Sequence, residues 1–210
     1  MVFSNSDTEE LLQRAEDGDS AAKQLLLTRH HDRLRRMIVV RMDPRLAARI
    51  DPSDVVQETA IEAARKLSGY LQRRDCAFYP WLRKIAWERL VQLHRQHIHA
   101  QKRSVKREVG WNTNLSNESV MLLAHQLKAS GASPSKNMMR NEMQQRVRAA
   151  LDRLTPQDRE VVVLQHLEQL AFNDVAEVLS ISESAVQSRY RRAIEQLHNL
   201  LSGGSTEELQ

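Results

Sequence analysis

Apolar residues recur at helical spacing along almost the whole chain. Within residues 7–28 they fall three or four positions apart, and an Asp-Gly-Asp-Ser break at 17–20 predicts two short helices. The next run, residues 29–42, puts three apolar residues on one face: Leu34, Ile38 and Met42. The most regular buried stripe repeats every four residues: Val55, Thr59, Ala63 and Leu67. No coherent strand pattern appears, so we expect an all-α protein.

The ends of several helices can be predicted from local chemistry. Asp51 can cap a helix whose first position is Pro52 and whose first turn carries the carboxylate of Asp54. Residues 68–80 (SGYLQRRDCAFYP) are expected to interrupt the helices, with a new helix over 81–97. Leucines at 151 and 154 end a later helix, and the Thr-Pro pair at 155–156 opens another.

Residues 170–197 have the pattern of a helix-turn-helix. Two helical periods are separated by a three-residue break, and Ser182 can cap the second helix. That helix presents a polar, cationic side: Gln187, Ser188, Arg189, Arg191 and Arg192. Short apolar helix pairs match this motif by chance, but the arginine cluster favours a recognition helix in the DNA major groove. The sequence does not say which arginine reads bases and which holds phosphates.

The segment between the two helical parts is richer in Ser, Asn and Gly. We therefore expect two small helical domains joined by a flexible linker, with boundaries at 7–103, 104–132 and 133–201 and a flexible tail at 202–210. A short helix is expected inside the linker at 120–127, and the Ser133-Pro134 pair is expected to start the next helix.

Charge is distributed unevenly along the chain. The net charge is +4, but residues 83–107 hold eight Lys or Arg and one acid, a local +7 that leaves −3 for the rest. On the helical wheel of 81–97 one side gathers an aromatic ring among cations: Arg83, Lys84, Trp87, His94 and Arg95. This mixture suits single-stranded bases and phosphates; the alternative is that Trp87 packs at the domain rim. An acidic row on the preceding helix suits either a basic partner or solvent: Asp54, Glu58 and Glu62.

Catalytic, metal and membrane chemistry is not indicated. There is no Gly-rich phosphate loop, no G-x-S-x-G and no acid–base constellation, so we expect no enzyme, no cofactor and no metal. The histidines at 94, 97 and 99 lack carboxylate or cysteine partners at ligand spacing and are expected to face phosphates. The single Cys76 lies beside two arginines that would lower its pKa. No membrane span or signal peptide is predicted, so we expect a cytoplasmic protein.

Two blocks of the chain together resemble one family. DPSDVVQETAIEAARKL followed by CAFYPWLRKIAWERLVQLHR resembles region 2 of bacterial sigma factors, and LDRLTPQDREVVVLQHLEQLAFNDVAEVLSISESAVQSRYRRAI resembles region 4. With no region 3 domain between them, the chain resembles the extracytoplasmic-function (ECF) sigma factors over about 7–103 and 133–201. The occurrence of both blocks in this order is far more specific than either block alone.

The resemblance implies two promoter anchors and several partners. A helix of the first domain would dock on core RNA polymerase through Asp51, Asp54, Val55, Gln57 and Glu58. The following loop and helix would bind and melt the −10 DNA element through Asp75, Ala77, Phe78, Tyr79, Trp81, Arg83, Lys84, Trp87 and Arg95. The recognition helix would bind the −35 element through Ser184, Gln187, Ser188, Arg189, Arg191 and Arg192. The linker would thread the RNA-exit path, an anti-sigma factor is a further implied partner, and the protein would associate with the nucleoid.

Four positions depart from the family pattern. Glu88 and Gln92 stand where the family usually has Asn and Asp, and we expect Glu88 to pair with Arg95 or turn inward. Ala171 replaces the usual Ser cap and Ser180 the usual turn Gly. Two other functions stay open from the residues alone. One is a stand-alone helix-turn-helix regulator that dimerises through 121–127, and the other is an interaction protein responding to metal or redox state.

Overall fold

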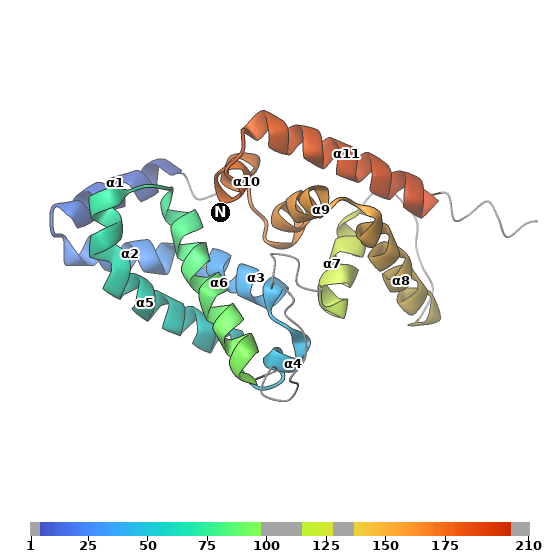
Figure 1. Cartoon of the computed structure of the whole chain (residues 1–210), viewed down its shortest axis with the longest axis horizontal. Helices are drawn as coiled ribbons and strands as arrows, with labels where there is room; N and C mark the ends of the chain where they lie inside the picture. Colours follow the sequence, from blue (N-terminus) through green and yellow to red (C-terminus); the bar gives the residue numbers. More distant parts are fainter. Residues whose placement is uncertain (1–4, 98–114, 128–136, 203–210) are drawn as a thin grey trace, which may run out of the picture. The chain divides into compact units, whose positions relative to one another are not determined.

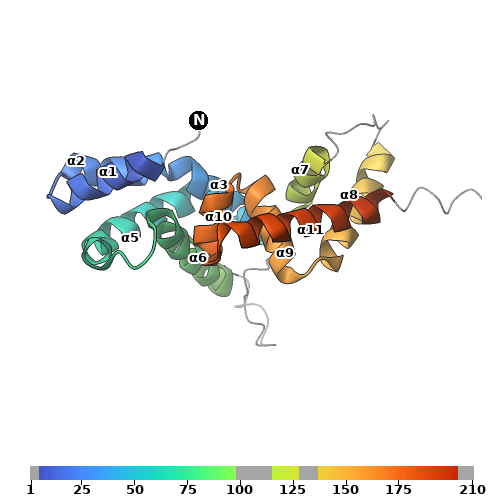
Figure 2. The ribbon, with the colours of Figure 1, turned by 90° about the horizontal axis from the view of Figure 1, so that it is seen from above.

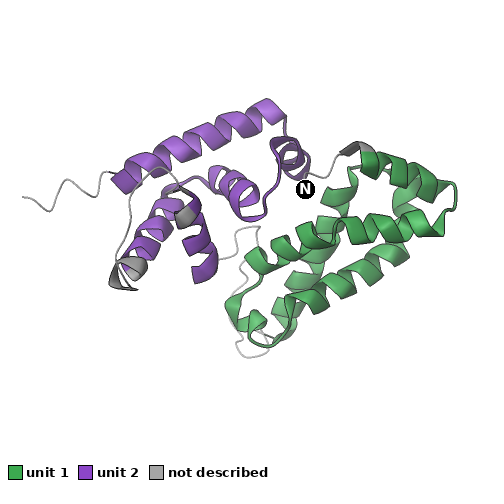
Figure 3. Cartoon of the chain, turned by 180° about the vertical axis from the view of Figure 1, so that it is seen from behind, with its two compact units in different colours: residues 1–108 green, residues 109–210 purple. Residues whose placement is uncertain are grey.

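The computed structural model describes residues 5–97, 115–127 and 137–202, and every regular element in these ranges is a helix (Figure 1). The prediction of an all-α protein is therefore confirmed. The chain forms two compact units, residues 1–108 and 109–210 (Figure 3).

Over residues 5–97, unit 1 contains six helices: α1 (Asn5–Glu16), α2 (Ser20–Arg29), α3 (His31–Arg41), α4 (Pro44–Ala47), α5 (Pro52–Arg73) and α6 (Phe78–His97). α1 and α2 lie side by side, and α5 packs against α3 and α6 (Figure 2). The predicted stripe of α5 is confirmed, because Val55, Thr59, Ala63 and Leu67 are all at most 3% exposed. Together with Leu34 and Ile38 of α3 and the apolar face of α6 they form one core.

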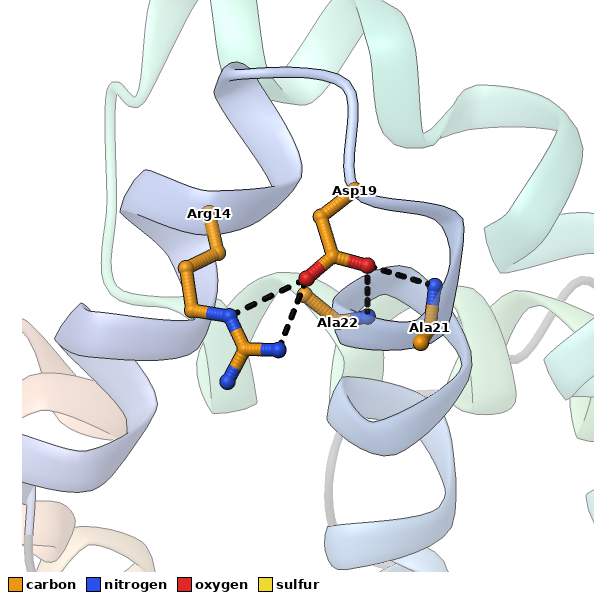
Figure 4. A network of polar contacts seen from close by, with 4 residues as sticks. All are labelled: Arg14, Asp19, Ala21 and Ala22. Carbon is orange, nitrogen blue, oxygen red and sulfur yellow. Dashed lines mark hydrogen bonds and ion pairs between the residues drawn. The ribbon is translucent and has the colours of Figure 1, made fainter.

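The turn between α1 and α2 is held by Asp19 (Figure 4). One oxygen, Oδ1, accepts the backbone N–H groups of Ala21 and Ala22 at 2.8 and 3.1 Å, which caps α2. The other oxygen, Oδ2, accepts from Nε and Nη2 of Arg14 at 3.1 and 2.7 Å. Gly18 supplies the left-handed backbone of the turn with φ +93°. The predicted break at 17–20 is confirmed, and its cause is this local capping.

The boundary between α5 and α6 differs from the prediction. Residues 68–73, expected to interrupt the helices, continue α5, and α6 begins at Phe78 rather than at 81. α5 continues because Tyr70 is 2% exposed and packs in the core, which outweighs the weak helix preference of Ser68 and Gly69. The helix ends at Arg74, whose backbone is left-handed with φ +41°. Pro80 is accommodated in the first turn of α6, where its missing N–H breaks no helical bond.

Unit 2 contains α7 (Asn117–Leu127), α8 (Asn137–Arg153), α9 (Pro156–Val162), a π-helical turn η2 (Val163–Leu167), α10 (Phe172–Leu179) and α11 (Glu183–Ser202). α11 packs against α9, α10 and α8 (Figure 2). Thr155 caps α9 by accepting the backbone N–H of Asp158 at 3.2 Å, and Pro156 occupies the first turn, as predicted. The predicted helix start at Ser133-Pro134 lies outside the described residues.

α7 falls within the range predicted to be linker, yet it packs on α8 and η2. Its apolar side is buried through Val120, Leu123 and Ala124, and Gln144 Nε2 donates to the Asn117 carbonyl at 2.8 Å. Arg148 Nη2 adds a bond of 2.9 Å to the Leu115 carbonyl. A helix was expected at 120–127, but its apolar face packs against the other helices of unit 2. The remaining linker residues lie outside the described ranges.

Leu123→Ala is expected to destabilise unit 2 by about 2–5 kcal/mol, because a fully buried leucine leaves both lost apolar contacts and a cavity. The measurement is urea denaturation of the full chain followed by circular dichroism. Leu122→Ala is the matched control, since Leu122 is 47% exposed and its removal should change stability by less than about 0.5 kcal/mol. Equal effects of the two substitutions would mean that α7 does not form part of unit 2.

Candidate nucleic-acid interface

The predicted helix-turn-helix forms from α10 and α11. Residues 180–182 separate the two helices, and Ser182 Oγ accepts the backbone N–H of Ala185 at 3.2 Å, so the predicted break and cap are confirmed. Ser180 adopts the left-handed backbone that a turn glycine would take, with φ +54°. At the start of α10, Ala171 makes no side-chain cap. The motif is therefore closed by the Ser182 cap and by packing.

The two helices share a small core. Val175, Ala176, Val186 and Leu197 are buried, whereas Val178, Leu179, Ile181 and Ile194 are half-buried. Tyr190 adds contacts that the sequence analysis missed: its hydroxyl lies 3.1 Å from His166 Nε2, and its ring meets Phe172 edge-on at 5.2 Å. Burial lowers the pKa of His166 and raises that of Tyr190. Both groups are therefore neutral near pH 7, and they join α11 to η2 and α10.

The outer side of α11 is polar and accessible. Four of the six predicted −35 residues are exposed, and their side-chain hydrogen bonds within the described residues stay inside α11 and its turn: Ser184, Gln187, Ser188 and Arg191. Gln187 Nε2 donates to Glu183 Oε1 at 3.2 Å within the same helix, which still leaves its carbonyl oxygen as an acceptor. Arg189 is half-buried. The structure thus brings together a polar face on one helix, and the DNA major groove is wide enough to admit an α-helix.

The sixth residue, Arg192, has a partner on another helix. Its Nε and Nη2 donate to Oδ2 and Oδ1 of Asp158 at 3.0 and 2.6 Å. The Arg192 guanidinium holds the pKa of the Asp158 carboxyl below its ordinary value. In the sequence Asp158 reads as an ordinary acid in the first turn of a helix, so nothing local revealed this pair.

In unit 1 the loop between α5 and α6 is shaped by aromatic packing. Tyr70 donates its hydroxyl proton to the Cys76 carbonyl at 2.9 Å, and its ring stacks on Trp81 with 4.6 Å between centroids. Phe78 contacts both rings, at 5.7 Å from Tyr70 and 5.5 Å from Trp81. Arg74, at the end of α5, binds Glu9 and Glu16 of α1. The loop before α6 is therefore held at Arg74 by α1 and at Cys76 by Tyr70.

The predicted −10 residues do not all share one accessible face. Asp75, Lys84 and Arg95 are exposed, and Ala77, Trp81 and Trp87 are half-buried. Phe78, Tyr79 and Arg83 are 2, 4 and 1% exposed. The expectation that Arg83 lies on the outward side of its helix is therefore wrong.

The reason lies in the earlier start of α6. It places Phe78 and Tyr79 in the first turn, where they pack around His30. Arg83 follows Tyr79 by four residues on the same side of the helix. The guanidinium of Arg33 lies 4.0 Å over the ring of Tyr79, which adds a cation–π contact to this packing.

The residues implied in polymerase docking lie at the start of α5. Asp51 caps the helix by accepting the N–H of Ser53 at 2.7 Å, while Asp54, Gln57 and Glu58 are exposed. Val55 is fully buried in the core, so its assignment to a contact surface is wrong. The acidic row is partly neutralised within the unit. Glu58 binds Arg89 at 2.6 Å, and Glu62 lies 3.1 Å from Lys66 and 3.6 Å from Arg65.

Glu88 lines a groove of about 420 Å³ between α5 and α6, shared with Glu58, Glu62, Arg65, Lys66, Arg89 and Gln92. Glu88 is exposed, and among the described residues no ion pair joins it to Arg95. Both expectations for Glu88 are therefore wrong. Gln92 accepts from Arg89 Nη1 at 2.8 Å. The two departures from the family pattern thus lie on the α5 side of α6.

The pKa of Cys76 is raised, because of desolvation and the nearby carboxylate of Asp75. The predicted lowering by neighbouring arginines is therefore wrong, since Arg74 turns toward α1. His94 lies 3.5 Å from Asp43. In the ranges that the structure describes, no group of three or more side chains could hold a metal ion, and no helix could cross a membrane. His99, Lys102, Arg103, Lys106 and Arg107 lie outside these ranges.

The chain is similar to a family model and to several known proteins. A family model described as "Sigma-70, region 4" matches residues 144–197, which include α10 and most of α11. Over 189 residues the chain is 28% identical to the ECF RNA polymerase sigma-E factor of Haemophilus influenzae, covering 90% of this chain and 92% of that protein. It is also 28% identical to the RNA polymerase sigma-H factor of Pseudomonas aeruginosa, covering 95 and 96%. The sigma-E factor of Escherichia coli K12 gives 28% identity with 90 and 91% coverage.

Among solved structures, the chain is similar to one described as CnrH in complex with the cytosolic domain of CnrY. The identity is 23%, the coverage is 92% of this chain and 96% of that one, and the TM-score is 0.46.

Proposed function

The chain is an extracytoplasmic-function sigma factor, and from this premise we propose that it binds core RNA polymerase and directs transcription initiation at specific promoters. The observation that carries the proposal is the helix-turn-helix of α10 and α11, which lies in the segment matched by the region 4 model. Its exposed polar face supports binding of the −35 element by Ser184, Gln187, Ser188, Arg189, Arg191 and Arg192.

Unit 1 would carry the two other tasks of a sigma factor. The exposed start of α5 supports docking on core polymerase through Asp54, Gln57 and Glu58, with Asp51 capping the helix. The loop and outer side of α6 support contact with the −10 element through Asp75, Trp81, Lys84, Trp87 and Arg95. An unpaired base can be held there at an unstacking cost of a few kcal/mol, which binding to duplex, strand and polymerase together would offset.

The proposed domain roles follow the sequence-based boundaries: residues 7–103 for polymerase and the −10 element, 104–132 as connection, and 133–201 for the −35 element. Within the connection, α7 packs on unit 2. Such a factor hydrolyses no nucleotide and acts by binding alone. It would act in the cytoplasm, where the polymerase and the nucleoid are. An anti-sigma factor that binds both domains is a further partner that the family suggests.

The test is reconstitution. Purified protein added to core polymerase should form a holoenzyme that starts transcripts at discrete sites on genomic DNA fragments, whereas core polymerase alone should not. Failure to bind core polymerase would overturn the proposal. A footprint of a dimer on a palindrome without polymerase would instead favour a stand-alone helix-turn-helix regulator. The burial of α7 argues against a dimer contact through residues 121–127, because Met121, Leu123 and Ala124 are at most 9% exposed.

Arg191→Ala is expected to weaken holoenzyme binding to the −35 element by about 1–3 kcal/mol and to relax base preference at one position, if the exposed guanidinium contacts a base edge. The measurement is competition between promoter variants that differ at single −35 positions. Arg153→Ala serves as the control, because Arg153 is an exposed cation of unit 2 outside α10 and α11. An equal loss on every sequence would make Arg191 a phosphate contact instead.

A further inference from the structure

The ion pair between Asp158 of α9 and Arg192 of α11 is asymmetric. The carboxylate side chain is 1% exposed, whereas the arginine side chain is 61% exposed. A carboxylate removed from water needs partners for its oxygens, and the two N–H groups of Arg192 supply them at 3.0 and 2.6 Å. The acid therefore takes no part in the outer surface of unit 2. What Asp158 does is to hold the guanidinium of Arg192 in one conformation through two hydrogen bonds.

Asp158 is itself fixed in place. It lies in the first turn of α9, and its backbone N–H donates to the capping hydroxyl of Thr155 at 3.2 Å. The hydrogen bond from Arg192 and one with Thr155 both help to lower the pKa of the carboxyl, so it is ionised near pH 7. Thr155, Asp158 and Arg192 thus form a chain of polar contacts from the α9 cap to α11. These contacts fix the direction in which the Arg192 side chain points from α11, a helix of 20 residues.

The guanidinium retains binding capacity after this contact. Of its five N–H donors, two bind Asp158, and three remain on the side away from the carboxylate. With 61% of the side chain exposed, these donors can reach an acceptor outside the protein. Because the rotamer is already fixed, less side-chain entropy is lost when that acceptor binds. The free edge of a fixed guanidinium suits the oxygens of a phosphate.

The place of Arg192 on α11 separates it from the base-facing residues. Gln196, one turn after Arg192 on α11, donates to the Arg153 carbonyl at 3.2 Å. This side of α11 thus faces the corner between α8 and α9. Arg191 points 100° away from Arg192 around the helix, is exposed and shares the side of Ser184 and Gln187.

We propose that Asp158 is a positioning residue that holds Arg192 as a phosphate clamp at the flank of the −35 element, while the neighbouring Arg191 faces the bases. The proposal rests on the proposed function of α11. It divides between two adjacent arginines the two roles that the sequence left unassigned. It also gives a function in DNA binding to an acid whose own side chain is only 1% exposed.

A double-mutant cycle tests the proposal on the holoenzyme. The probe is a promoter duplex selected from random DNA by the wild-type holoenzyme, and binding is measured over a range of salt concentrations. Arg192→Ala should weaken binding about tenfold on all sequences and make the logarithmic salt slope shallower by about 0.9, the value for one phosphate contact. Asp158→Ala should cause a smaller loss in the same direction. The double variant should bind like Arg192→Ala alone, because Asp158 acts only through Arg192.

Additive losses in the double variant would overturn the proposal, since they would mean that Asp158 acts through the fold of unit 2. Tighter binding by Asp158→Ala would also overturn it, because the carboxylate would then compete with DNA for the arginine. Asp158→Asn keeps one acceptor oxygen and provides the comparison if the alanine variant does not fold. It should lie between wild type and Arg192→Ala, and a loss beyond that of Arg192→Ala would count against the proposal.

Failure of this proposal can be told apart from failure of the proposed function. Neither substitution should alter binding to core polymerase, which is measured separately by gel filtration. If the wild-type chain forms a promoter-specific holoenzyme but the cycle is additive, only the role of Asp158 is wrong. If the wild-type chain does not bind core polymerase, the proposed function itself is wrong.

Discussion

At pH 4.5 unit 1 is expected to be less stable than at pH 7 by about 2–3 kcal/mol because of His30 alone. The pKa of His30 is lowered from 6.5 to about 3, first by burial and then by the charges of Arg33 and Arg29. In the unfolded chain the ring has its ordinary pKa. Protons therefore bind the unfolded state between these two pKa values and shift the equilibrium toward it.

The geometry around His30 explains the shift. The residue is 2% exposed, and its ring centroid lies 5.3 Å from that of Phe78 and 5.8 Å from that of Tyr79. Neither ring nitrogen has a hydrogen-bond partner within the part of the chain that the structure describes. The charged groups acting on it, Arg29 and Arg33, are both cationic. A protonated ring would thus be buried beside like charges without an acceptor.

The stability supplied by neutral His30 is fully present above pH 6.5 and is lost as the pH falls toward 3. Urea denaturation at pH 7 and pH 4.5 measures the loss. His30→Leu should flatten this dependence while leaving stability at pH 7 nearly unchanged, because it removes two buried nitrogens that make no hydrogen bonds. An equally steep dependence in the leucine variant would show that other groups carry the acid sensitivity.

The features that the sequence predicted correctly depend on neighbours in the chain. The caps at Asp51, Thr155 and Ser182 and the turn at 17–20 each rest on a side chain two or three residues from the N–H it binds. The buried stripe of α5 follows from helical periodicity alone. Such local rules were enough to locate the helix-turn-helix and to support the family resemblance.

The features that it missed depend on contacts between distant residues. The pair of Asp158 and Arg192 joins positions 34 residues apart, and neither residue type signals the other. Tertiary packing extends α5 beyond Ser68 and Gly69 to Arg73, and α6 begins at Phe78. Phe78 and Tyr79 are therefore buried in the first turn of α6 instead of lying in a loop. The helical wheel for 81–97 placed Arg83 outward, although Ala86 and Leu90, three and seven residues later on the same side, are buried. Periodicity identifies a face of a helix but not the partner that covers it.

Tyr70→Ala is expected to have the largest effect of any substitution near the proposed −10 site, a loss of about 3–5 kcal/mol of unit 1 stability. Tyr70 is 2% exposed and stacks on Trp81 at 4.6 Å between centroids. Its removal would also free the loop before α6, because the hydroxyl binds the Cys76 carbonyl at 2.9 Å. Burial raises the pKa of Tyr70 to about 12, so the hydroxyl remains a proton donor at every pH of interest.

Tyr70→Phe separates the two contributions, since it keeps the stacked ring and removes only the hydrogen bond, at about 0.5–1.5 kcal/mol. Promoter opening by the holoenzyme should then be slowed on duplex DNA but much less on DNA that already carries an unpaired −10 segment, because a loosened loop impairs capture of a base from the stack. Permanganate reactivity of unpaired thymines measures opening. Equal slowing on both templates would mean that Tyr70 supports the fold of unit 1 without shaping the loop for base capture.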